Sequence, residues 1–73
     1  MLNLKRINLS WNKLTTQSLT PLFSLQKLEY INLNYNNIED IAKSFVKLKN
    51  LRILKLAGNQ INGREQLLKL RKN

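Results

Sequence analysis

One pattern of aliphatic residues and an asparagine occurs three times along the 73 residues of the chain. Its third copy, in the stretch LRILKLAGNQI, comprises Leu51, Leu54, Leu56, Asn59 and Ile61. The same offsets recur at Leu28, Ile31, Leu33, Asn36 and Ile38, and at Leu4, Ile7, Leu9, Asn12 and Leu14. The leading leucines are 24 and 23 residues apart. Self-similarity at such a period indicates a repeat architecture, in which neighbouring units share one core.

The spacing within one copy predicts a strand followed by a turn. Leu54 and Leu56 alternate as strand residues do, so both point to one face. Ile61 follows the strand, and only a turning chain brings it back to the same core. Asn59 lies in this turn, where its side-chain amide can both donate and accept hydrogen bonds. It is therefore expected to pair with backbone groups that the turn removes from the strand ladder.

The three copies resemble the leucine-rich repeat family, whose signature is L-x-x-L-x-L-x-x-N-x-L. The resemblance covers nearly the whole chain. It implies an α/β leucine-rich repeat solenoid, with a short parallel sheet on the concave face and short helices on the convex face. We expect a single domain over residues 1–73, with repeats near 1–24, 25–47 and 48–73.

Each repeat is expected to join its strand to a helical return segment. The sequence predicts strands over residues 3–9, 29–33 and 52–56. Thr20 and Pro21 suit the cap and the first position of a first helix. A second helix is expected from Asp40, as its cap, to about Lys49. The stretch 62–65 has capping-box spacing and predicts the start of a third helix.

The amino-acid composition does not favour catalysis. The chain has no histidine and no cysteine, and it has no sequence resembling a phosphate loop, so the usual nucleophile–base pairs cannot be assembled. Glu39 and Asp40 are the only adjacent acids and are interpreted as a helix N-terminus. We therefore expect a non-enzyme without cofactor or metal. The absence of cysteine favours an intracellular, cytoplasmic location.

Neither a membrane span nor a signal peptide is predicted. No uninterrupted apolar run approaches the roughly 20 residues of a membrane span. Asn3, Lys5 and Arg6 interrupt the apolar start that a signal peptide needs. Met1 already occupies a core position, and no capping element precedes it. The chain is therefore expected to be a fragment of a longer array or an incompletely capped array, with possible self-association through its N-terminal edge.

Residues that alternate with the inward positions are expected to face the concave surface. The predicted binding residues on this face are Arg6, Asn8, Trp11, Tyr30, Asn32, Tyr35, Ile53 and Lys55. Trp11 and Tyr35 each precede a turn asparagine directly, so they should stack at one rim, with Gly58 continuing the row as a notch. The alternative is that Trp11 only covers the first repeat.

Two contacts internal to this face are also predicted. Lys5, Glu29 and Arg52 alternate in sign across neighbouring strands and are interpreted as a ladder of ion pairs. The aromatic ring of Tyr30 is placed to form a cation–π pair with Arg6. Two interpretations of Asn32 remain: it is a binding residue, or it is only an exposed polar residue that keeps the surface soluble.

The family resemblance implies a non-catalytic protein–protein interaction module that binds an unidentified partner through the concave sheet. A net charge of +9 raises the alternative of electrostatic binding to nucleic acid or acidic surfaces. Of the thirteen basic residues, however, only Lys5, Arg6, Arg52 and Lys55 fall on the concave face. Nucleic-acid binding is therefore expected to be weak and salt-sensitive. A structural segment of a longer solenoid is the third alternative.

Overall fold

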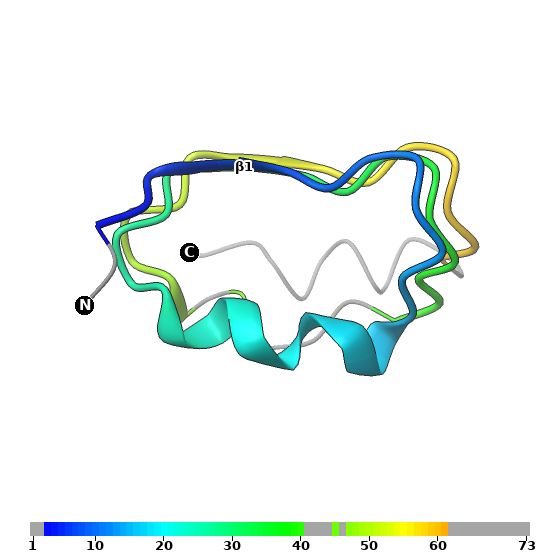
Figure 1. The fold of residues 1–73 in the computed structure, drawn as a ribbon, viewed down its shortest axis with the longest axis horizontal. Coiled ribbons are helices and arrows are strands. Elements are labelled where there is room, and N and C mark those ends of the chain that lie inside the picture. Colours follow the sequence, from blue (N-terminus) through cyan, green and yellow to red (C-terminus); the bar gives the residue numbers. More distant parts are fainter. Residues whose placement is uncertain (1–2, 41–44, 46, 62–73) are drawn as a thin grey trace, which may run out of the picture.

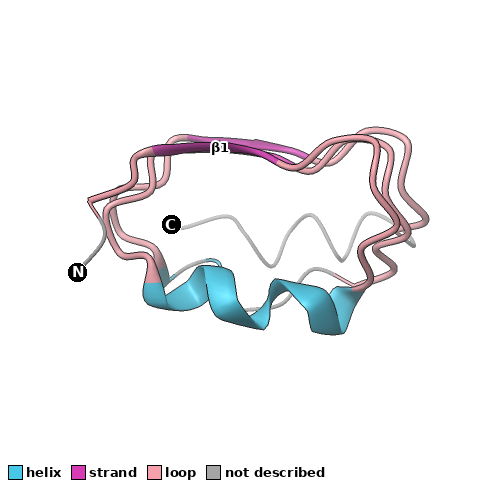
Figure 2. Ribbon diagram, viewed as in Figure 1, coloured by secondary structure: helices cyan, strands magenta, loops and turns pink. Residues whose placement is uncertain are grey.

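The computed structural model describes residues 3–40, 45 and 47–61 (Figure 1). In chain order, its elements are β1 (Arg6–Asn8), the 3₁₀ helix η1 (Thr16–Ser24), β2 (Tyr30–Asn32) and β3 (Ile53–Lys55). The strands form one parallel sheet in the order β1-β2-β3. η1 lies opposite this sheet, and the segments that follow the three strands trace closely similar paths (Figure 2).

The strand register confirms the predicted alignment of the repeats. Arg6 pairs with Tyr30, and Tyr30 pairs with Ile53. Each strand spans three residues and is shorter than predicted. Backbone hydrogen bonding nevertheless continues past the strand ends, for example from the Trp11 N–H to the Asn34 carbonyl (3.0 Å). The predicted pairing of the repeats is therefore correct over a longer stretch than the strands themselves.

The core lies between the sheet and the return segments. Its buried side chains are Leu19, Leu22, Leu28, Ile31, Leu33, Ile38, Phe45 and Leu48. The central strand is the most enclosed, because it has a neighbour on each side. Ile31 of β2 is fully buried, whereas its equivalents Ile7 and Leu54 are half-buried. Phe23 and Phe45 add an edge-to-face contact, with ring centroids 5.0 Å apart.

The turn asparagines have the predicted role and also join neighbouring units. The side-chain amide of Asn36 donates to the carbonyls of Leu33 (3.0 Å) and Leu9 (3.1 Å), and its Oδ1 accepts the Leu14 N–H (3.0 Å). Asn59 repeats this arrangement one unit later. Backbone groups in the first and second turns are thus bonded by the side chain of the next unit.

The start predicted for the first helix is wrong. The helix begins at Thr16, with Thr15 as its cap, and Pro21 lies inside it. The Thr15 N–H donates to Ser18 Oγ (3.0 Å), so Ser18 takes the position that glutamate or glutamine usually occupies in a capping box. Pro21 has no backbone N–H, so at this position the 3₁₀ helix lacks one of its hydrogen bonds.

The other two predicted helices fall largely or wholly outside the described residues. These include residues 41–44 and 46 of the second helix and the whole stretch 62–73. Phe45 and Leu48, both predicted to point inward from the second helix, are buried. Met1, which was assigned a core position, also lies outside the described part of the chain.

Candidate functional site

The side of the sheet that faces away from the core carries the predicted binding residues. We call this side the outer sheet face and define it by the outward residues of the three strands: Arg6, Asn8, Tyr30, Asn32, Ile53 and Lys55. Their positions on either side of the inward Ile7, Ile31 and Leu54 follow from strand alternation. Ile53 exposes 47% of its surface, although it is a large apolar residue. The sheet therefore presents apolar as well as charged groups outward.

Trp11 and Tyr35 form an aromatic rim in the turns that follow β1 and β2. Their rings are stacked, with centroids 4.1 Å apart and planes inclined by 15°, which confirms the predicted stacking. Trp11 is nevertheless 75% exposed and Tyr35 45% exposed. Both have a φ of 61°, a left-handed conformation that bulky residues rarely adopt. The backbone of the turn therefore holds both side chains in a conformation that costs some strain.

Gly58 occupies the equivalent position in the third unit, with a φ of 71°. It does not form the open notch expected from the sequence. A Cβ atom placed on Gly58 would lie 2.2 Å from Cδ1 and 2.6 Å from Cε1 of Tyr35. The Tyr35 ring therefore lies directly against the backbone of Gly58. The missing side chain is what allows this contact, and Trp11 then stacks on the same Tyr35 ring.

We expect Gly58→Ala to lower the free energy of unfolding by about 1–2 kcal/mol, because it combines a left-handed alanine with a displaced ring. Denaturant melts of the variant measure this loss. In a Tyr35→Ala background the same substitution should cost less, since the steric contribution disappears and only the backbone contribution remains. Equal costs in the two backgrounds would show that the ring does not occupy this space.

Two basic side chains approach Tyr30 at the centre of the outer sheet face. The guanidinium carbon of Arg6 lies 4.2 Å from the ring centroid, which confirms the predicted cation–π pair. Lys55 was not predicted as a partner, but its Nζ lies 5.9 Å from the same centroid. Lys55 pairs in register with Asn32 and not with Tyr30, so it reaches Tyr30 diagonally. Cations from both neighbouring strands, β1 and β3, thus approach the ring of Tyr30.

A hollow of about 240 Å³ lies beside this cluster, lined by Arg6, Glu29, Tyr30, Arg52 and Ile53. The predicted ladder of ion pairs does not form here. In the part of the chain that the structure describes, no contact within 4.0 Å joins the charges of Lys5, Glu29 and Arg52. Glu29 and Arg52 were predicted only as members of that ladder, yet both line the hollow. Their charges can therefore face a ligand.

Asn8 and Asn32 are partly committed to their own turns. The Oδ1 of Asn8 accepts the backbone N–H (3.0 Å) and the hydroxyl (2.7 Å) of Ser10. The Oδ1 of Asn32 accepts the Asn34 N–H (3.0 Å). Neither Nδ2 group makes a hydrogen bond to a described residue. These asparagines therefore shape the strand ends, and each keeps an amide donor for a partner.

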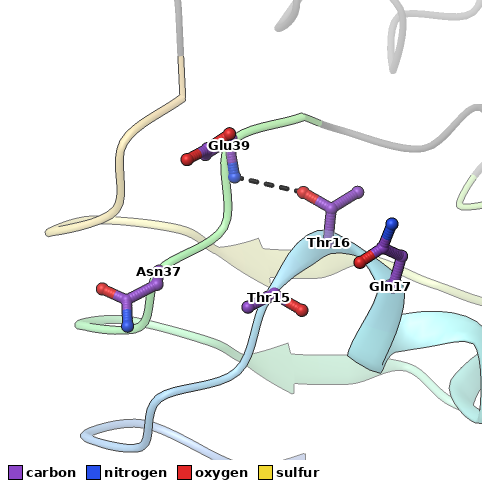
Figure 3. A pocket seen from close by; sticks show the side chains of 5 residues that line it. All are labelled: Thr15, Thr16, Gln17, Asn37 and Glu39. Atoms are coloured by element: carbon purple, nitrogen blue, oxygen red, sulfur yellow. Dashed lines mark hydrogen bonds between the residues drawn. The ribbon is translucent and has the colours of Figure 1, made fainter.

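A second hollow, of about 250 Å³, is lined by Thr15, Thr16 and Gln17 at the start of η1 and by Asn37 and Glu39 of the next unit (Figure 3). Its main contact is structural. Thr16 Oγ1 accepts the backbone N–H groups of Glu39 and Asp40, both at 3.1 Å. Thr16 thus joins the start of η1 to the next unit, a role that no sequence pattern predicted. A single carboxylate among neutral groups gives this hollow no evident chemistry.

The described residues contain no group of three or more side chains suited to hold a metal ion. Among the same residues, no helix has the length and apolar character needed to cross a membrane.

Comparison with known families agrees with the geometry of the repeats. A sequence model of the leucine rich repeat family matches residues 2–61. The chain therefore belongs to the leucine-rich repeat family, whose domains generally mediate protein–protein interactions and are typically non-enzymatic. Searches of curated proteins and of solved structures found no significant match.

Proposed function

We propose that this chain is a curved leucine-rich repeat solenoid, or part of one, that binds another protein through its outer sheet face as the concave surface. The observation that carries the proposal is the aromatic rim. Trp11 and Tyr35 are exposed yet held in one arrangement by stacking. Aromatic residues that are exposed in the free protein and rigid are typical anchors of protein interfaces.

The rim is suited to binding because its side chains would lose little conformational freedom when a partner binds. The Trp11 and Tyr35 backbones are fixed by hydrogen bonds to Asn34 (3.0 Å) and Ala57 (2.7 Å). Side-chain ordering costs about 0.5–1.5 kcal/mol for each immobilised group in an interface. Rings that are already stacked avoid part of that cost. Burying Trp11 under a partner would also remove a large apolar surface from water.

Site-specific photo-crosslinking tests which face binds. A photoreactive phenylalanine analogue at position 11 or 35 should capture a partner protein from the cell that expresses this chain. The same analogue at Gln17, an exposed residue of η1, serves as the control on the opposite side. Equal capture of the same partner from position 17 would contradict the proposed face.

With a captured partner in hand, Trp11→Ala and Tyr35→Ala should each weaken its affinity by about 2 kcal/mol, or roughly 30-fold, the range of interface hot spots. Lys47→Ala is the matched control, because Lys47 is exposed and lies outside the outer sheet face. Titration calorimetry measures the affinities, and circular dichroism checks that each variant is folded. Loss of affinity in Lys47→Ala alone would move the interface elsewhere.

Nucleic-acid binding predicts different results. Affinity for a mixed-sequence DNA or RNA would then fall steeply between low and physiological salt, and removing basic residues such as Lys47 would weaken it additively. We expect only weak and salt-sensitive association. Tight, salt-resistant binding that requires Trp11 and Tyr35 would overturn the proposal, because bases would then stack on the rim.

A further inference from the structure

In the part of the chain that the structure describes, the outer sheet face has an excess of positive charge without ion pairs. Lys5, Arg6, Arg52 and Lys55 lie on or beside this face, together with a single carboxylate, Glu29. Among the described residues, no ion pair engages these groups. Positive surface of this kind is complementary to an acidic partner, and such complementarity gives specificity and speeds association.

The cations near Tyr30 have defined positions relative to its aromatic ring. The Arg6 guanidinium lies 4.2 Å from the Tyr30 centroid. An arginine stacked on a ring keeps its N–H donors at the edge of its plane, where they can meet a carboxylate in bidentate geometry. Lys55 approaches the same ring at 5.9 Å from β3, the neighbouring strand on the other side, and supplies a second positive charge to this face. The adjoining hollow, lined in part by Arg52, gives an acidic side chain a place to enter.

The aromatic rim offers one binding surface and not a series of them. One face of the Trp11 indole is stacked on Tyr35, and the Tyr35 ring also lies against Gly58. The other face of the indole therefore remains open, in agreement with the 75% exposure of Trp11. A single apolar or aromatic group fits this arrangement. Single-stranded nucleic acid would instead use several successive stacking surfaces.

The two subsites, the cations around Tyr30 and the aromatic rim at Trp11 and Tyr35, are close enough for one short peptide to reach both. Tyr30 and Tyr35 are five positions apart in one nearly extended stretch, so they lie at most about 17 Å from each other. An extended ligand covers that distance in about five residues, and a helical ligand in about eleven.

We infer that the outer sheet face binds an acidic protein segment, with carboxylates on Arg6, Lys55 and Arg52 and one apolar or aromatic anchor on Trp11. This inference rests on the proposed function and adds the chemistry of the partner. The carboxylates and the anchor of the ligand should therefore lie at most about five residues apart in an extended segment, or about eleven in a helical one.

Selection from a phage-displayed library of random 12-residue peptides tests the inference on the full chain. We expect the peptides that bind at physiological salt to be enriched in aspartate and glutamate and to share one aromatic or large aliphatic residue. The affinity of a selected synthetic peptide should fall about tenfold or more with Arg6→Glu/Lys55→Glu, the effect of about 1.4 kcal/mol or more. Lys47→Glu/Lys49→Glu changes the net charge equally, away from this face, and should alter affinity less than about threefold.

Each other outcome is decisive as well. If neutral peptides are selected and require Trp11, the acidic partner is excluded while the proposed interaction face stands. If no peptide is enriched, or if the two charge-reversal variants lose affinity equally, the inference fails. A 12-nucleotide single-stranded DNA that binds more tightly than every selected peptide, and that depends on Arg6 and Lys55, would also overturn it. Peptide composition on the unmodified chain gives a result even where a variant does not fold.

Discussion

Leu33→Ala is expected to lower the free energy of unfolding by about 2–5 kcal/mol, the range for emptying a leucine site in a packed core. Leu9 and Leu56 occupy the equivalent positions of the first and third units. Leu33 is fully buried, whereas Leu9 and Leu56 are half-buried. The same substitution at either of these positions should therefore cost less, because part of the side chain already contacts water and the surroundings can relax.

Denaturant melts of the three leucine variants give a matched comparison at one repeat position. Lys47→Ala completes the series, since this exposed residue should change stability by no more than about 0.5 kcal/mol. If Leu9→Ala proved as costly as Leu33→Ala, the central unit would not be the most enclosed part of the core.

Asn36→Ala is expected to cost about 1–3 kcal/mol, the penalty for a buried group that loses its partner. The affected group can be identified. The carbonyls of Leu9 and Leu33 keep hydrogen bonds from Asn12 and Asn59, both at 2.8 Å. The Leu14 N–H, in contrast, bonds only to Asn36 Oδ1 among the contacts of the described residues. The loss should therefore appear chiefly as faster hydrogen exchange at Leu14.

Asn36→Asp should be more damaging at neutral pH, at about 3 kcal/mol or more, because a carboxylate would face carbonyl oxygens where the amide now donates. Those oxygens raise the pKa of the introduced carboxyl above its usual value of about 3.9. A raised pKa in the folded state means that the penalty is smallest below pH 3.9 and grows as pH rises through the folded-state value.

Melts of Asn36→Asp and of the unaltered chain at pH 3 and pH 7 measure this difference. Asn37→Asp provides the control, because Asn37 is the exposed neighbour of Asn36. It should show little change between the two pH values relative to the unaltered chain. A penalty for Asn36→Asp that stayed constant with pH would mean that the amide of Asn36 does not face the carbonyls.

Most of the sheet could be predicted from the sequence because a repeat imposes its own register. Once Leu28 was aligned with Leu4 and Leu51, the columns of outward residues followed, and with them the Trp11–Tyr35 stack and the Arg6–Tyr30 pair. The start of η1 could not be predicted in the same way. Thr15 and Ser18 form its cap. Thr20-Pro21 is a more familiar pattern for a helix start, but in the structure it lies inside the helix.

The finer chemistry of the candidate site depended on side-chain positions that spacing does not specify. Gly58 looked like an empty place because nothing in the sequence states which way the Tyr35 ring leans. Alternating charges suggested ion pairs for Glu29 that do not form, since neighbouring backbones can align while long side chains diverge. One signal was available for Asn8: the side chain of an asparagine often hydrogen-bonds to the backbone two residues further on.

The hydrogen bonds of the turn asparagines imply an order of folding during synthesis, because earlier turns are completed by asparagines that come later in the chain. Asn36 reaches back 22 residues to Leu14 and 27 residues to Leu9, and Asn59 reaches back 21 residues to Ile38. On a ribosome, the first and second turns therefore wait for the asparagine of the next unit to emerge. At about 5–20 residues per second, the 22 residues between Leu14 and Asn36 take about 1–4 seconds to synthesise. During that interval the first turn of the nascent chain exposes a backbone N–H for a chaperone or water to satisfy.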